Sequence, residues 1–236
     1  MLAEIILIGG GYLFGSLPFS VALARLRGLD ISQEEDLHIA LWRHTGKKLV
    51  ILATAVDFFK GVIVILIGFG LGISSTAVAF SGVTTVAGQM WPPPYGHGEK
   101  GNTPAVAVVL TLSLVYGVYW ALLSLIFFAT GAALKYRYDG RSTTSHETKG
   151  AETKSYTSNH PMALSLPLGM LSGFIVAPAA SWHSKGLTTI TQAFLLLLII
   201  IVVRRLTANL KADLKKGNVT VRMLIERFLF DQLLER

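Results

Sequence analysis

GQMWPPPYGHGEKGNT, residues 88–103, separates two apolar runs of this chain of 236 residues. Its three consecutive prolines cannot continue a helix, and its glycines let backbone N–H groups turn toward a bound anion. Lys100, between Glu99 and Gly101, adds a compact positive charge to that turn. The stretch therefore has two interpretations: an ordinary loop between membrane helices, or a loop that holds a phosphate group beside the bilayer.

The apolar runs on either side of this stretch define the fold class. The chain is 52% hydrophobic and 15% charged, with a mean hydropathy of +0.55. Several runs reach the ~20 residues that cross a hydrocarbon core, which predicts an all-α, polytopic bundle of membrane helices. In a membrane protein, a net charge of +7 is typical of Lys and Arg in cytoplasmic loops that contact anionic lipid. We therefore expect no nucleic acid as a partner. The absence of cysteine excludes disulfides and cysteine-based metal sites.

Charge placement predicts the topology of the chain. We expect a retained first helix, because the N-terminus lacks the basic region of a cleaved signal peptide. Arg25 and Arg27 follow the first span, which places its end in the cytoplasm and the N-terminus outside. Residues 104–134 are long for one crossing and short for two; two short helices, broken near residues 113–117, bring the basic C-terminus inside. The seven expected spans are residues 5–24, 49–73, 76–91, two within 104–134, 162–182 and 188–203.

The polar segments are expected on the cytoplasmic side of a single membrane domain that covers residues 1–236. Residues 135–160 are rich in Ser and Thr and cannot bury enough apolar surface to fold alone, so we expect a mobile loop. In the tail, residues 207–236, apolar side chains recur at helical spacing from Val221 to Leu233, which predicts an amphipathic helix at the membrane interface.

Two features interrupt the apolar character of the spans. The break Gly15-Ser16-Leu17-Pro18 is tolerated where the freed backbone groups are buried in protein or face a wet cavity; the alternative is a simple kink. Asp57 and Lys60 lie three residues apart on one helical face, so they can pair with each other in the bundle interior. The alternative to a functional role for these two charges is a mutually neutralising structural pair.

Five short motifs follow one another along the chain. They read GSLPF at residues 15–19, RHTGKK at 43–48, DFFKG at 57–61, GQMWP at 88–92 and GEKG at 98–101. They resemble, in the same order, the G-S-x-P-F, R-x-x-G-K-K, D-x-x-K-G, G-H-x-F-P and G-G-K-G motifs of the bacterial membrane glycerol-3-phosphate acyltransferases that use acyl-phosphate. The resemblance covers most of the chain, apart from residues 135–160.

The resemblance implies an enzyme of the cell membrane whose active-site loops face the cytoplasm. It would move an acyl group from acyl-phosphate to the 1-hydroxyl of glycerol 3-phosphate, giving lysophosphatidic acid for phospholipid synthesis among membrane lipids. Acyl-phosphate is already activated, so positioning two anions could supply much of the rate enhancement without a protein nucleophile, a metal or a cofactor. The implied phosphate ligands are Arg43 and Lys100, and the implied supporting residues are Ser16, Gly98, Gly101, Asn209, Asp57 and Lys60. Taken alone, without the resemblance, Arg43 is more often an ordinary juxtamembrane cation.

The chain also departs from the family pattern. The glycine-rich G-S-G-N-I-G-A-T-N motif is replaced by SQEEDLHIA at residues 32–40, whose three acids repel phosphate unless they turn away. The family histidine is Gln89, one glycine is Glu99, and the C-terminal H-R-x-N-I-x-R-L motif is matched only by Asn209-Leu210. Two alternatives therefore stay open. One is a paralogue with lost or altered activity that binds lipid phosphate or serves as an assembly partner. The other is a small anion transporter, against which stands the absence of inverted repeats.

Overall fold

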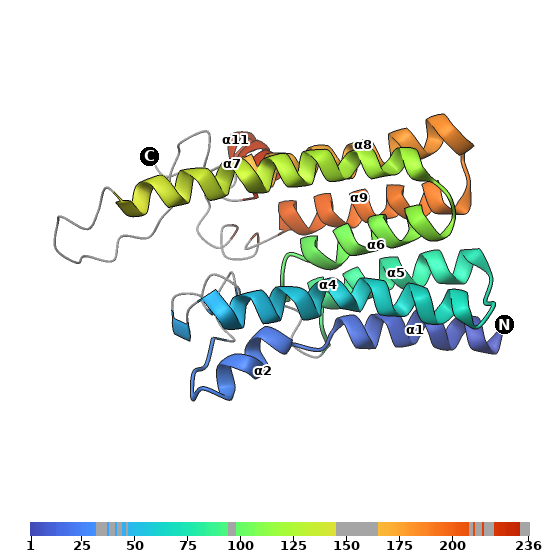
Figure 1. Cartoon of the computed structure of the whole chain (residues 1–236), viewed down its shortest axis with the longest axis horizontal. Helices are drawn as coiled ribbons and strands as arrows, with labels where there is room; N and C mark the ends of the chain where they lie inside the picture. Colours follow the sequence, from blue (N-terminus) through green and yellow to red (C-terminus); the bar gives the residue numbers. More distant parts are fainter. Residues whose placement is uncertain are drawn as a thin grey trace.

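The computed structural model describes residues 1–31, 37, 41, 44–45, 47–93, 98–144, 165–207, 210, 214 and 220–231. Within these ranges the secondary structure is helical, without a strand. Figure 1 shows an elongated bundle in which the longer helices run side by side along the long axis. The expected all-α class is confirmed.

Helices occupy every stretch in which a span was predicted. They are α1 (Leu2–Gly15), α2 (Phe19–Arg25), α4 (Lys47–Gly70), α5 (Ser75–Met90), α6 (Asn102–Val115), the 3-10 turn η1 (Tyr119–Leu123), α7 (Ser124–Thr144), α8 (Ser165–Lys185), α9 (Thr189–Thr207) and α11 (Val221–Phe230). By length and composition, five stretches of the described chain can cross a membrane: Leu2–Arg25, Lys48–Gly70, Tyr119–Arg137, Ser165–Lys185 and Thr189–Thr207. With 16 and 14 residues, α5 and α6 are shorter than an ordinary crossing of about 20 residues. Seven crossings and their orientation therefore stay predictions.

Both predicted breaks are present in the structure. The first span is divided at Ser16, Leu17 and Pro18, and α2 turns away from the axis of α1 (Figure 1). Residues 104–134 are divided between α6 and α7, with η1 between them, because the chain turns at Gly117 with a φ of 66°. That left-handed conformation costs a glycine little and other residues more.

The prediction of a loop at residues 135–160 is wrong for residues 135–144. Helix α7 continues past the apolar segment as far as Thr144. Polar side chains do not end a helix by themselves, since its backbone hydrogen bonds are closed within the segment, and no proline intervenes before Pro161. Residues 145–160 lie outside the described part of the chain.

The predicted tail helix exists as α11, and it packs against α8 and α9. It buries Met223 and Arg227, whereas Val221 and Ile225 are exposed. Exposed apolar side chains next to basic ones are compatible with a membrane interface, but that location stays a prediction.

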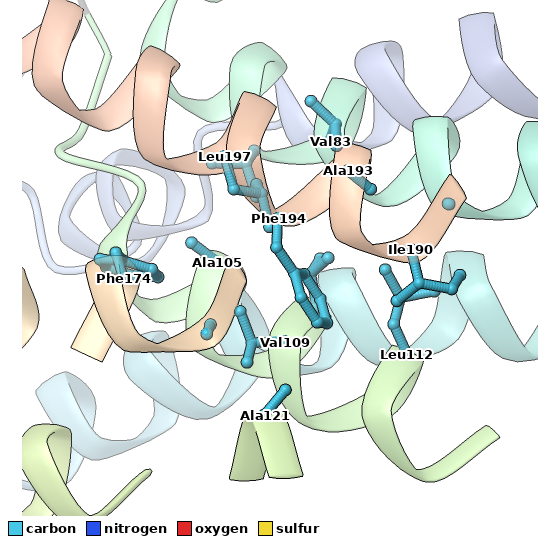
Figure 2. Packing of buried hydrophobic residues seen from close by; sticks show 14 of the residues in the cluster. Val83, Ala105, Val109, Leu112, Ala121, Phe174, Ile190, Ala193, Phe194 and Leu197 are labelled. Carbon is cyan, nitrogen blue, oxygen red and sulfur yellow. The ribbon is translucent and has the colours of Figure 1, made fainter. Parts of the chain in front are cut away.

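The largest apolar cluster joins α5, α6, α8 and α9. Figure 2 shows Phe194 and Leu197 of α9 in this cluster with Val109 of α6 and Phe174 of α8. Lipid tails are as apolar as these side chains, so in a membrane the cluster is stabilised mainly by van der Waals packing.

Glycines bring α1 and α5 into close contact. A Cβ atom on Gly15 would lie 1.9 Å from the Thr85 carbonyl oxygen, and one on Gly88 would lie 2.0 Å from the Tyr12 carbonyl oxygen. The hydroxyl of Tyr12 also donates to the carbonyl oxygen of Trp91 at 2.6 Å. The break after α1 is thereby fixed beside the stretch that follows α5.

Candidate functional site

The Asp57–Lys60 pair lies inside the bundle. Lys60 Nζ is 2.8 Å from Asp57 Oδ1, and the two side chains are 2% and 1% exposed, respectively. The same ammonium group donates to the carbonyl oxygens of Leu17 at 2.8 Å and Gly15 at 3.4 Å. Those carbonyls belong to the break between α1 and α2. Lys60 therefore supplies donors to backbone groups at the break, and its charge is balanced by Asp57.

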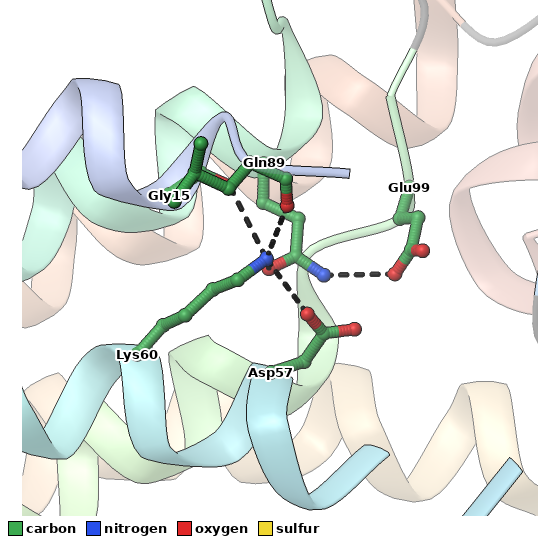
Figure 3. Close-up of polar contacts among 6 residues, drawn as sticks. Gly15, Asp57, Lys60, Gln89 and Glu99 are labelled. Atoms are coloured by element: carbon green, nitrogen blue, oxygen red, sulfur yellow. Dashed lines mark hydrogen bonds and ion pairs between the residues drawn. The ribbon is translucent and has the colours of Figure 1, made fainter. Parts of the chain in front are cut away.

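Gln89 connects this pair to the glycine loop, defined as residues 98–101. Its Oε1 atom accepts from Lys60 Nζ at 3.4 Å, and its Nε2 atom donates to Glu99 Oε2 at 2.8 Å. Figure 3 shows the resulting chain of polar contacts from Asp57 through Lys60 and Gln89 to Glu99. Gln89 and Glu99 are two positions at which the sequence departs from the family motifs, and the structure brings them into contact.

Close packing explains both outer glycines of the glycine loop. A Cβ atom on Gly98 would lie 2.0 Å from the Gln89 carbonyl oxygen, and Gly101 has a φ of 69° against the Met90 side chain. The Gly98 N–H donates to the Met90 carbonyl oxygen at 3.2 Å. The sequence predicted backbone N–H groups turned toward an anion, but this N–H group is engaged within the protein.

Arg204 fixes the glycine loop from the other side. Its Nη2 atom donates to the Gly98 carbonyl oxygen at 2.7 Å. The next residue, Arg205, donates to the carbonyl oxygens of Phe228, Leu229 and Pro167, and it is 2% exposed. A cation at the C-terminal end of a helix is stabilised by the helix dipole, so Arg205 suits the end of α11. In the sequence, these two arginines are part of the basic C-terminal segment that predicts topology, and nothing there indicates their contacts.

Lys100 is paired with a residue that the sequence analysis did not single out. Lys100 Nζ lies 3.1 Å from Asp231 Oδ2, and the side chains are 38% and 8% exposed. Asp231 follows the last residue of α11 and has a left-handed φ of 55°. The contact joins residues far apart in the chain, and no local motif indicates it.

The remaining predicted site residues are only partly described. Ser16 lies at the break, where its hydroxyl donates to the Tyr12 carbonyl oxygen at 2.8 Å. Arg43, Asn209 and the acids at residues 34–36 lie outside the described residues. The structure therefore brings together Ser16, the buried pair and the glycine loop. Within the described ranges, no group of three or more His, Asp or Glu side chains could hold a metal ion.

An apolar groove lies beside the glycine loop. Its volume is about 400 Å³, and it opens along the N-terminal half of α4. Thr103, two residues beyond the loop, lines it together with Val50, Ile51, Thr54, Phe58 and Phe59. An apolar surface of this kind suits a hydrocarbon chain, and it begins two residues beyond the glycine loop that carries Lys100.

Comparison with known proteins identifies the family of this chain. A family model described as Glycerol-3-phosphate acyltransferase matches residues 5–145. Over 107 residues the chain is 36% identical to the glycerol-3-phosphate acyltransferase of Aquifex aeolicus, covering 43% of this chain and 56% of that protein. Over 117 residues it is 32% identical to that of Geobacter metallireducens, covering 48% and 60%. The chain thus spans little more than half the length of these curated relatives.

Solved structures share the fold over nearly the whole chain. Crystal structures of PlsY (YgiH), an integral membrane glycerol 3-phosphate acyltransferase, are known in a lysophosphatidic acid form and a glycerol 3-phosphate form. Each superposes with a TM-score of 0.63, covering 92% of this chain and 94% of that chain, at 24% and 22% identity. At that identity the likeness establishes the fold.

Proposed function

Because the chain belongs to the glycerol-3-phosphate acyltransferase family, we propose that it transfers an acyl group from acyl-phosphate to the 1-hydroxyl of glycerol 3-phosphate. The product is lysophosphatidic acid, the substrate of further phospholipid synthesis. The observation that carries this proposal is the family match, whose residues 5–145 include all five motifs and Lys100.

The phosphate groups are assigned to the loops at one end of the bundle. Lys100 supplies a partly exposed ammonium group on a loop that Arg204 and Met90 hold in place. Arg43 is the proposed second cation, because a guanidinium binds phosphate in a bidentate manner. Asn209 and Ser16 are proposed as supporting polar contacts. The Asp57–Lys60 pair is too deeply buried to touch substrate, and its proposed role is to support the break and, through Gln89, the glycine loop.

The apolar groove on α4 is the proposed binding site of the acyl chain, since Thr103, two residues beyond the glycine loop, lines it. The glycerol oxygen forms the new ester bond to the acyl carbon, the bond from that carbon to phosphate breaks, and phosphate leaves with the proton of the hydroxyl. Fixed cations that offset the charge of both phosphates lower the barrier, as does alignment of the two reactants. The loops are proposed to face the cytoplasm from the cell membrane, where acyl-phosphate and membrane lipids are at hand.

One observation favours a second candidate function. Lys100 is paired with Asp231, and Gln89 and Glu99 replace family residues beside it. A paralogue that binds lipid phosphate without turnover would tolerate such changes. Substrate binding and turnover must therefore be measured separately.

Isothermal calorimetry with glycerol 3-phosphate tests the phosphate site. We expect the parent protein in detergent micelles to bind, and Arg43→Ala and Lys100→Ala each to weaken binding at least tenfold. Lys185→Ala, an exposed lysine at the opposite end of α8, is the matched control and should bind like the parent. Undiminished binding in both loop variants would exclude the shared site, and no binding by the parent would exclude glycerol 3-phosphate as the substrate.

A further inference from the structure

The contact between Lys100 and Asp231 places an anion of the protein where the proposed function places an anion of the substrate. A carboxylate and a phosphate present similar oxygen acceptors to an ammonium group. The Asp231 side chain is nearly buried, whereas more than a third of the Lys100 side chain is exposed and accessible to a ligand. This acid comes from the end of α11, far along the chain from the glycine loop.

Asp231 is presented from a fixed helix end. Arg205 donates to the carbonyl oxygens of Phe228 and Leu229 in the last turn of α11, and the Asp231 N–H donates to the Arg227 carbonyl oxygen at 2.9 Å. Met223 anchors the same helix against the bundle. The backbone that carries Asp231 is therefore held by contacts that do not involve Lys100. Both α11 and Asp231 lie outside the residues that the family model matches.

We propose that Asp231 is a built-in competitor for the anion position at Lys100, so that glycerol 3-phosphate binds by displacing the Asp231 carboxylate. The inference rests on the proposed function and adds an affinity-determining residue to the same site. A dianionic phosphate displaces a carboxylate with one charge, because its attraction to the ammonium group is larger. Weaker anions do not, so Asp231 favours phosphate monoesters over carboxylates at this lysine.

Calorimetry on Asp231→Asn tests the inference, with glycerol 3-phosphate and glycerate as the two probes. Asparagine tolerates the left-handed conformation, so the end of α11 is preserved while the charge is removed. We expect the Kd for glycerol 3-phosphate to fall about fivefold, which corresponds to the upper end of a partly exposed ion pair. The Kd for glycerate should fall by at least as much. Glu226→Gln removes one charge from the same helix at a carboxylate that pairs with Arg222, and it should leave both values unchanged.

The possible results distinguish failure of the Asp231 proposal from failure of the proposed function. An unchanged or weaker affinity of Asp231→Asn, with a parent that binds, would overturn the competitor and leave the proposed function standing. An equal gain in Glu226→Gln would overturn it as well, because net charge alone would then explain the effect. If none of the three proteins bound glycerol 3-phosphate, the proposed function would fail and the inference with it. Should Asp231→Asn not fold, Asp231→Gly removes the same charge with the residue that helix ends favour at this position.

Discussion

Removing one member of the buried Asp57–Lys60 pair should destabilise the protein far more than the loss of an exposed ion pair would. In Asp57→Asn, Lys60 loses its counter-charge but keeps the carbonyl oxygens of Leu17 and Gly15 and the Gln89 amide oxygen. Breaking a buried ion pair costs about 3–5 kcal/mol, and the remaining acceptors of Lys60 place this variant at the lower end, at about 3 kcal/mol.

Lys60→Met should cost more, at about 5 kcal/mol, because it leaves a buried carboxylate and withdraws the donor from two backbone carbonyls at the break. The double variant Asp57→Asn/Lys60→Met removes both charges and leaves mainly the carbonyls unpaired. Its expected cost is about 4 kcal/mol, well below the sum of the single costs, since the two residues are directly coupled.

The free energy of unfolding should be measured in detergent micelles by titration with a denaturing detergent, followed by circular dichroism. Lys48→Met is the matched control, because Lys48 is an exposed lysine on the same helix and its replacement should change stability by less than about 0.5 kcal/mol. Single costs below about 1 kcal/mol, or costs that simply add in the double variant, would refute the claim that this pair is buried and mutually dependent.

Two further predictions concern the close approach of the helices and the glycine loop. Gly15→Ala should cost about 3 kcal/mol, because its Cβ atom would lie 1.9 Å from the Thr85 carbonyl oxygen. A Cβ atom at Gly10, on the same helix, meets nothing within 4 Å, so Gly10→Ala should be neutral or stabilising. If thermal unfolding showed equal losses of stability in the two variants, this packing would be contradicted. Arg204→Ala should lower kcat/KM for glycerol 3-phosphate about tenfold, because it removes the donor to the Gly98 carbonyl oxygen, and Arg204→Lys should recover part of the loss. An Arg204→Ala variant as active as the parent would show that the glycine loop does not need this contact.

The sequence predicted those features that depend on local chemistry. The spacing of Asp57 and Lys60 indicates a pair on one helical face, and Pro18 and Gly117 mark helix breaks because of their own backbone restrictions or freedom. The continuation of α7 to Thr144 differs from the predicted loop, because a polar segment can stay helical through its own backbone hydrogen bonds.

Contacts between distant segments could not be predicted in the same way. Arg204 reaches Gly98 and Asp231 reaches Lys100 only because α9 and α11 pack where the glycine loop ends. Neither pair lies at a helical or turn spacing, so one sequence carries no periodic signal for it. The contact between Gln89 and Glu99 has no such signal either, although both residues depart from the family motifs.

The formation of lysophosphatidic acid by the purified protein tests the central claim most directly. The reaction needs acyl-phosphate and radiolabelled glycerol 3-phosphate in detergent or liposomes, with Lys100→Ala and Lys185→Ala assayed in parallel. The account predicts labelled product with the parent and with Lys185→Ala, and a loss of at least tenfold with Lys100→Ala. A folded parent protein that binds glycerol 3-phosphate yet forms no product from acyl-phosphate would contradict the account and favour the paralogue without turnover.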